Sequence, residues 1–272
     1  MFGKKNVSAV VAEFLGTGVL TMLVLSVQRS TIGVPFFVAA MAGLTIFMMM
    51  YALVGVSGAN FNPALTLALW TARKASTARA VFYIGAQLLG AWVAYYLYTY
   101  LVGSKLTFIG GHYTARILVA EAFGTALFGF AFAALSNHNA PRSTKSAVAG
   151  LAFMVAMVAS STASIGLVNP ALALGVRAWV WGTYVLGPVL GAVLGVNLYN
   201  LFFVFKNDDK DEALVEVNNY DTNFTVINEV PAKKTTSSKS KKPAAKKPAA
   251  KKSNRRQQIA EISIYIGVIC SS

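Results

Sequence analysis

The stretch Ser57-Gly58-Ala59-Asn60-Phe61-Asn62-Pro63-Ala64-Leu65 and its shorter echo, Val168-Asn169-Pro170-Ala171-Leu172, decide the fold of this chain. In both copies, Asn-Pro-Ala-Leu stands where a long apolar segment has ended and a shorter apolar run begins. An Asn side chain caps the first turn of a helix, and Pro suits the first helical position because its missing N–H would have no partner there. Each copy therefore predicts the start of a helix.

The two helices predicted after these starts, over residues 65–71 and 172–180, are apolar but short. A helix that crosses a bilayer needs about 20 residues, so neither can span. Half-spans in membrane proteins direct their positive N-terminal ends toward the midplane. With one half-span in each half of the chain, we expect the two to form a pair.

The composition is that of a membrane protein. The 272 residues are 56% hydrophobic and 12% charged, and the mean hydropathy is +0.56. Of the ten acidic residues, only Glu13 and Glu121 precede Asp208, which is too few for a soluble domain of that length. A single cysteine, Cys270, excludes a disulfide framework. Two isolated histidines, His112 and His138, do not predict a metal site, and we expect no cofactor.

Six segments are long and apolar enough to span the bilayer. They are residues 7–27, 34–56, 80–102, 117–135, 147–163 and 178–205. Glycines within them, such as Gly85, Gly90 and Gly191, would let neighbouring helices approach closely. Lys and Arg are concentrated before the first span and in alternate loops, so the positive-inside rule predicts that both termini are cytoplasmic in a plasma membrane protein.

The chain is a duplicated unit. The motif Val-Ala-Glu at Val11 recurs 108 residues later at Val119, and Asn-Pro-Ala-Leu recurs 107 residues later. Each unit holds three spans, an odd number, so the second enters the membrane from the opposite side. The predicted fold class is an all-α membrane protein with six transmembrane helices plus two half-helices in an inverted 3+3 repeat, over about residues 7–105 and 114–205.

These features resemble the major intrinsic protein family, the aquaporins and glycerol facilitators. The matching motifs are Ala-Glu-Phe-Leu-Gly-Thr from Ala12, Ser-Gly-Ala-x-x-Asn-Pro-Ala from Ser57, the second Asn-Pro-Ala at Asn169, and the Gly187-Pro188 to Gly191-Ala192 pattern. The resemblance covers residues 7–205. It implies an aquaporin-like channel domain over residues 1–206, usually assembled as a homotetramer with one pore per subunit.

The function implied by the resemblance is passive passage of water and small uncharged solutes, such as glycerol or urea, without enzymatic chemistry. The pore-lining motifs would be Asn62, Pro63, Ala64, Asn169, Pro170 and Ala171. Two amides that donate to a passing water would interrupt a proton wire, and two positive helix ends would repel cations. A lone Asn before Pro would only cap its helix, whereas this pair favours a pore.

The family's second constriction departs from its usual pattern here. The four corresponding positions are Ala42, Met157, Gly166 and Leu172, and Leu172 replaces the usual Arg. The Asp typical of glycerol facilitators is replaced by Ala173. We therefore expect a selectivity filter that is wider or at least more apolar than the family norm, and a substrate range that includes small neutral solutes besides water.

Glu13 and Glu121 are the only acids within the predicted spans. One hypothesis makes them a proton relay in a secondary transporter built on an inverted repeat. The other, which we favour, makes them structural acids that hold loop backbone near each half-helix. The sequence offers no Lys, Arg or His within the spans as a relay partner.

Residues 207–272 differ from the rest of the chain. Between Lys233 and Arg256 there are eleven basic residues and no acid, with Pro at regular intervals, which predicts a disordered basic cytoplasmic tail. We expect it to contact anionic lipids and, with less support, nucleic acid. A third hypothesis makes the membrane part an anchor for this tail.

Overall fold

The fold is a bundle of helices. The computed structural model describes residues 3–204, so the predicted tail and its partners lie outside the described residues. The elements are α1 (Lys4–Gln28), α2 (Pro35–Ser57), α3 (Pro63–Thr71), α4 (Thr77–Val102), α5 (Ala115–Asn137), α6 (Arg142–Ser160), α7 (Pro170–Gly175), the π-helical turn η1 (Trp181–Val185) and α8 (Leu186–Phe203). Within residues 3–204, six helices are long and apolar enough to cross a membrane, the sixth being η1 and α8 together. The predicted all-α class with six spans and two short helices is confirmed.

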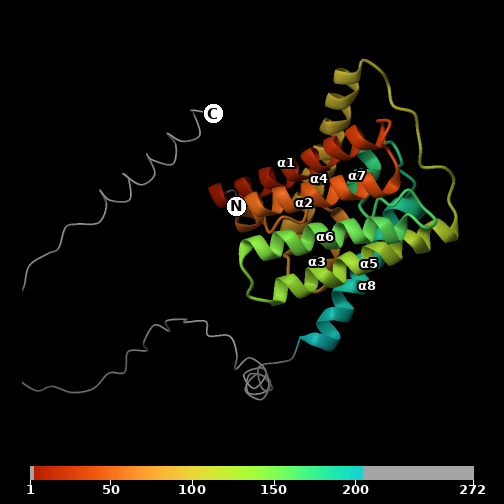
Figure 1. Cartoon of the computed structure of the whole chain (residues 1–272). Coiled ribbons are helices and arrows are strands. Elements are labelled where there is room, and N and C mark those ends of the chain that lie inside the picture. The colour runs from red at the N-terminus through yellow and green to blue at the C-terminus, as the bar shows by residue number, and fades with distance from the viewer. Residues whose placement is uncertain (1–2, 205–272) are drawn as a thin grey trace, which may run out of the picture. The chain divides into compact units, whose positions relative to one another are not determined.

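The order of elements repeats within the bundle. Helices α1 to α4 correspond in sequence order to α5, α6, α7 and η1–α8. The packing repeats as well, because α1 packs on α4 as α5 packs on α8, while α2 and α6 contact each other between the two halves. Figure 1 shows the long helices side by side, with α3 and α7 among them. The two short helices are interior elements, since Leu65 of α3 and Leu172 of α7 are fully buried.

Small residues let the long helices approach closely. A β-carbon on Gly150 of α6 would lie 2.5 Å from the carbonyl oxygen of Gly43 on α2. Gly191 of α8 is in direct contact with the backbone of Ala122 on α5. These contacts agree with the close packing expected of glycines in membrane helices. Gly85 is an exception to the prediction, because nothing lies within 4 Å of the position of its β-carbon.

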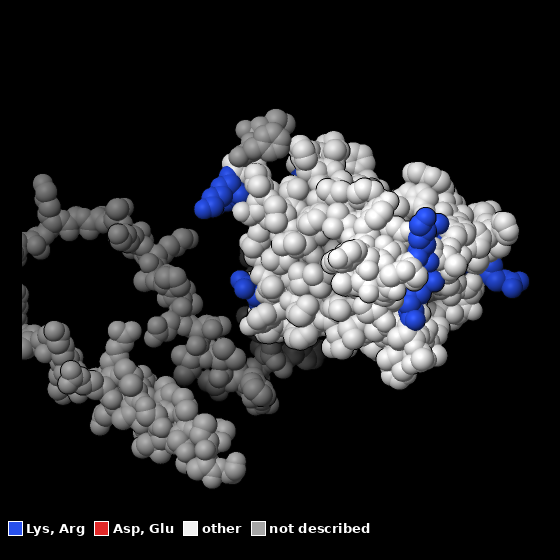
Figure 2. Space-filling view, turned by 90° about the horizontal axis from the view of Figure 1, so that it is seen from above, with Lys and Arg blue, Asp and Glu red and all other residues white. Residues whose placement is uncertain are grey.

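The outer surface of the bundle is apolar. Leu44, Val81 and Leu151 are each more than 60% exposed, at 62%, 63% and 63%. On the face shown in Figure 2, Lys and Arg gather toward the two ends, an uncharged band lies between them, and no Asp or Glu is visible. Together with the six spans, this surface identifies an integral membrane protein.

Several predicted boundaries were wrong. The third span begins at Thr77 rather than 80, and the fifth begins at Arg142 rather than 147. The fifth span ends at Ser160 rather than 163, where the chain turns so that Ser164 Oγ donates to Glu121 Oε1 at 2.6 Å. The sixth span begins as a π-helical turn at Trp181 rather than at 178. The second half-helix ends at Gly175 rather than 180.

Candidate functional site

The N-terminal ends of α3 and α7 meet at Asn62 and Asn169. Each Asn is the N-cap of its helix: Asn62 Oδ1 accepts a hydrogen bond from Ala64 N at 2.9 Å, and Asn169 Oδ1 accepts one from Ala171 N, also at 2.9 Å. Pro63 and Pro170 occupy the first helical position of their helices. The predicted helix starts are therefore confirmed residue by residue.

The two asparagines also bind across the junction. Asn62 Nδ2 donates to the carbonyl of Val168, and Asn169 Nδ2 donates to the carbonyl of Phe61, both at 2.9 Å. An amide group carries two N–H donors, so each Asn keeps one donor beyond this cross-junction bond. One donor of each amide therefore holds the opposite loop, a role that the Asn-Pro-Ala motifs alone do not indicate.

The loop residues that receive these bonds have unusual backbone angles. Phe61 and Val168 each have φ 48°, and two residues earlier Ala59 and Gly166 have φ 56° and 69°. A side chain in the left-handed region is strained, above all in a β-branched residue such as Val168. The same pair of positive φ angles recurs in both halves, so the two loops share one backbone geometry, and Gly166 is the member of the four that adopts it without strain.

Glu13 of α1 holds the first loop in this geometry. Its Oε1 accepts from Ser57 Oγ at 2.6 Å and Asn60 N at 3.0 Å. Its Oε2 accepts from Phe61 N and from Gln87 Nε2, both at 2.7 Å. The side chain is fully buried, and all of these contacts are with uncharged donors.

Glu121 of α5 does the same for the second loop. Its Oε1 accepts from Ser164 Oγ at 2.6 Å and Leu167 N at 3.0 Å, and its Oε2 accepts from Val168 N at 2.6 Å. In residues 3–204, neither glutamate forms an ion pair with Lys, Arg or His. The geometry agrees with the structural interpretation of both acids and provides no partner for a relay.

Both half-helices end on an arginine. Arg73 follows α3 with φ 56°, and Arg177 follows α7 with φ 68°. The next residues close the ends, because Lys74 N donates to Leu69 O and Ala178 N donates to Ala173 O, both at 2.8 Å. This is a Schellman motif with Arg where Gly is usual. It explains the early end of α7, and it places Arg177 over the ring of Tyr95, with 5.8 Å between guanidinium carbon and ring centroid.

The four positions expected to form the filter are buried in the described structure. Ala42 of α2 and Leu172 of α7 are fully buried, and Met157 of α6 is 1% exposed. Gly166 packs against α6, since a β-carbon there would lie 2.6 Å from Met157 O. The side chains of Ala42, Met157 and Leu172 are thus shielded from water in this conformation.

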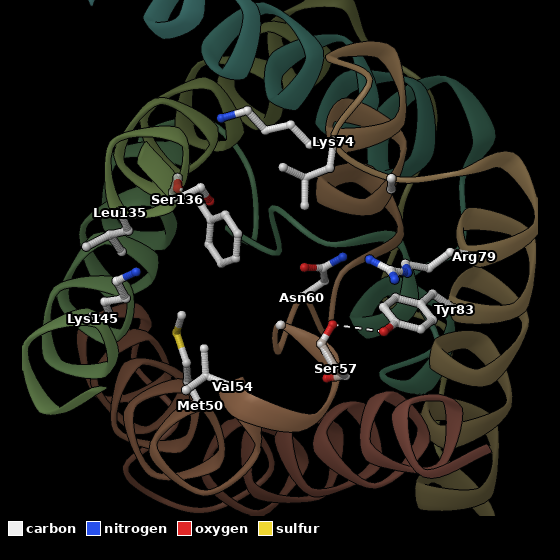
Figure 3. Close-up of a pocket in the computed structure, with 14 residues that line it drawn as sticks. Met50, Val54, Ser57, Asn60, Lys74, Arg79, Tyr83, Leu135, Ser136 and Lys145 are labelled. Carbon is white, nitrogen blue, oxygen red and sulfur yellow. Dashed lines mark hydrogen bonds between the residues drawn. The ribbon is translucent and has the colours of Figure 1, made fainter. Parts of the chain in front are cut away.

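A cavity of about 340 Å³ opens at the end of the bundle that contains the α3–α4 and α5–α6 loops, which we call the inner end. Its lining includes Asn60 next to the junction and the basic residues Lys74, Arg79 and Lys145. In Figure 3 these cations surround the cavity, and Tyr83 lies at its wall with its hydroxyl donating to Ser57 O at 2.8 Å. We call this cavity the inner vestibule.

Metal ligands are not gathered in the part of the chain that the structure describes. No group of three His, Cys, Asp or Glu side chains occurs within residues 3–204. His138 lies beside Tyr199 Oη, 3.2 Å from its Nε2 atom. The polar groups that the described site offers to a ligand are therefore hydrogen-bond donors, the amide groups of Asn62 and Asn169.

Comparison with known proteins gives one consistent result. The model of the family described as "Major intrinsic protein" matches residues 3–199. Aquaporin Z of Photorhabdus laumondii is 29% identical over 225 residues, covering 72% of this chain and 97% of that protein. Probable aquaporin PIP2-7 of Oryza sativa is 33% identical over 227 residues (71% and 78%). Aquaporin-9 of Mus musculus is 30% identical over 254 residues (74% and 84%).

The fold has a solved counterpart. The X-ray structure of the aquaglyceroporin from Plasmodium falciparum aligns with a TM-score of 0.60 at 20% identity, covering 78% of this chain and 99% of that one. The paired half-helices, the repeat of six spans and the match of the family model over most of the chain lead to one conclusion: the chain belongs to the major intrinsic protein family.

Proposed function

We propose that this chain is a passive transmembrane channel for water and small uncharged solutes, which cross the membrane between Asn62 and Asn169. The observation that carries the proposal is the reciprocal pair of 2.9 Å hydrogen bonds from these amides to Val168 O and Phe61 O. These bonds fix two helix N-termini face to face inside an apolar bundle. The relatives compared above are named as aquaporins, which supports the same function.

The junction is suited to neutral molecules. Each asparagine has one amide N–H left, so a passing water or hydroxyl can accept from both and can no longer accept in line from its neighbours. Pro63 and Pro170 lack an N–H, so they add no competing hydrogen-bond donor beside the amides. Ala64 and Ala171 have small side chains that leave space for a solute. In this proposal the four residues form the rest of the wall. The two helix ends carry partial positive charge, which disfavours cations and protons.

The filter of Ala42, Met157, Gly166 and Leu172 sets the solute range in this proposal. The side chains at all four positions lack a charge and a hydrogen-bonding group, and Leu172 and Met157 are at most 1% exposed. A passing solute then meets the Met157 and Leu172 side chains, and Met can adapt its shape to the solute because it has three flexible bonds. A solute that crosses gives up water contacts here without compensation, so small neutral solutes such as urea or glycerol are favoured over ions.

The alternative is a secondary transporter in which Glu13 and Glu121 relay protons. Against it, each carboxylate accepts hydrogen bonds from donors of its own loop and lacks a basic partner among the described residues. Saturable uptake that depends on an ion gradient would favour the transporter, whereas a channel gives flux proportional to the solute gradient.

The setting we propose follows from charge and surface. The inner end carries Lys74, Arg79 and Lys145, so the positive-inside rule makes it the cytoplasmic end, with both termini in the cytoplasm of a plasma membrane protein. The channel domain would comprise residues 1–206. The exposed apolar faces suit lipid and the homotetramer typical of the family, and the tail over 207–272 would contact anionic lipids before nucleic acid.

Stopped-flow light scattering on vesicles that contain the full chain tests this function. Sucrose, glycerol and urea gradients are applied in turn, together with a pH-sensitive dye inside the vesicles. The proposal expects water and at least one of the two small solutes to cross severalfold faster than in protein-free vesicles, without a proton signal. Equal rates with and without protein would refute it.

A further inference from the structure

The inner vestibule concentrates positive charge at a narrow place. Lys74 lies on the α3–α4 loop, Arg79 on α4 and Lys145 on α6, so three elements from both halves of the chain bring a cation to one cavity of about 340 Å³. Figure 3 shows the three side chains around the cavity, with Lys145 and Arg79 on opposite sides of it. Like charges so placed repel one another, and an anion between them would relieve that repulsion.

These cations lack an anionic partner in the described part of the chain. Lys74 Nζ donates to a neutral acceptor, Asn137 Oδ1, at 2.9 Å. Burial lowers the pKa of the Lys74 ammonium from its ordinary value, and no carboxylate opposes this shift. The two acids among residues 3–204, Glu13 and Glu121, are fully buried against their own loops. The vestibule is therefore a concave site lined by three cations that form no ion pair within residues 3–204. The carboxylate of Glu13 lies behind its wall, where Ser57 Oγ donates to it at 2.6 Å.

We propose that the inner vestibule binds a small multivalent phosphate anion of the size of pyrophosphate, and that the bound anion obstructs the passage. A guanidinium fork matches the geometry of phosphate oxygens, and two ammonium groups add point charges. A monovalent anion would gain little at a partly exposed site, because salt screens single charges over about 10 Å at 0.1 M. The obstruction rests on the proposed channel function, since Asn60 connects the vestibule wall to the Asn62 junction.

The test uses the full chain in neutral-lipid vesicles at low salt, with pyrophosphate on one side at a time. Flux without pyrophosphate reports the channel itself, and calorimetric titration of the purified protein reports binding whether or not the channel conducts. We expect pyrophosphate to reduce solute flux from the inner side only. In the variant K74Q/K145Q the half-blocking concentration and the dissociation constant should rise at least tenfold.

The matched control removes two cations from the opposite, outer end. Lys105 and Arg116 are exposed residues of the α4–α5 connection and the start of α5. The variant K105Q/R116Q loses the same charge as K74Q/K145Q and should keep the block unchanged. Equal weakening in both variants would show a general charge effect and overturn the site. Binding that persists unchanged in K74Q/K145Q would belong to the basic tail, which also overturns it.

The chain's own acids are the competing source of anionic oxygens. Asp208, Asp209, Asp211 and Glu212 follow α8 closely in sequence. The full-chain variant D208N/D209N/D211N/E212Q separates the two sources. If this variant conducts solute faster than the unaltered chain in the absence of pyrophosphate, and pyrophosphate does not block it, the vestibule binds these four carboxylates and the proposal fails. Unchanged basal flux with pyrophosphate block supports the small anion.

Discussion

The two halves of the molecule build the same junction with unequal support. In the first half, α3 has nine residues, and Glu13 accepts from four donors because Gln87 joins the three in the loop. In the second half, α7 has six residues, and Glu121 accepts from three loop donors at the corresponding positions. Yet the φ angles of Phe61 and Val168 are equal, and so are the two cross-junction distances. The loop backbone, rather than helix length, therefore defines the junction.

Removing the buried acids should have the largest effect and should distinguish the halves. Glu13→Ala leaves four donors without this acceptor. Glu121→Ala affects three donors, of which Ser164 Oγ keeps a second acceptor in Ser160 O at 3.1 Å. Each buried unpaired donor costs about 1–3 kcal/mol. Glu13→Ala should therefore lower the unfolding temperature in detergent more than Glu121→Ala. In a Gln87→Met background the difference should become smaller. If Glu121→Ala lowered the unfolding temperature more than Glu13→Ala, the number of donors would not determine how much each glutamate stabilises its loop.

The leucines that follow each Asn-Pro-Ala allow a sharper comparison of function. Leu65 and Leu172 are both fully buried, so either change to Ala should cost about 2–5 kcal/mol of stability. Only Leu172 belongs to the proposed filter, so Leu172→Ala should raise glycerol and urea flux severalfold while Leu65→Ala should not. Stopped-flow rates at equal protein content measure this. A similar gain in both variants would remove Leu172 from the filter.

The asparagines should show a smaller asymmetry of the same kind. Asn62→Ala and Asn169→Ala each lose a cap, worth about 1 kcal/mol, and leave an opposite carbonyl unpaired. Asn169 caps the shorter helix and its Oδ1 accepts from Ala171 N and, at 3.5 Å, Leu172 N. We expect Asn169→Ala to lower the unfolding temperature more. Both variants should also let protons enter vesicles loaded with a pH-sensitive dye. If neither variant conducts protons, the two amides are not what excludes protons from the passage.

The smallest effects are expected at the helix ends. Arg73 and Arg177 occupy left-handed positions that cost an L-residue about 1–2 kcal/mol, so replacement by Gly should stabilise the fold slightly. The gain should be smaller for Arg177→Gly, because that change also removes the contact with Tyr95. Thermal unfolding of the two variants side by side measures the difference, and a loss of stability in Arg73→Gly would show that the arginine charge outweighs backbone strain.

Much of the fold was predictable because its signals are local. The sequence shows directly where the two Asn-Pro helices start, which six segments are apolar, and that a unit repeats after 107 residues. The hydrogen bonds of the two helix caps agree with these predictions. The roles of Ser57, Ser164 and Gln87 were not predictable, because their contacts with the glutamates span 43 to 74 residues. The cross-junction bonds and the cation-lined vestibule likewise depend on packing between halves. The arginines that end the half-helices were missed because Gly is the usual signal.

Osmotic shrinkage of vesicles measures the passage itself. Neutral-lipid vesicles that contain the full chain are compared with vesicles that contain the same amount of a folded Leu172→Trp variant. Our account predicts shrinkage severalfold above the protein-free rate for the full chain, and a return to the protein-free rate when a bulky ring fills the position beside the Asn62–Asn169 junction. If the full chain gave no acceleration, or if the Trp variant conducted as fast as the full chain, no passage would run between the two asparagines.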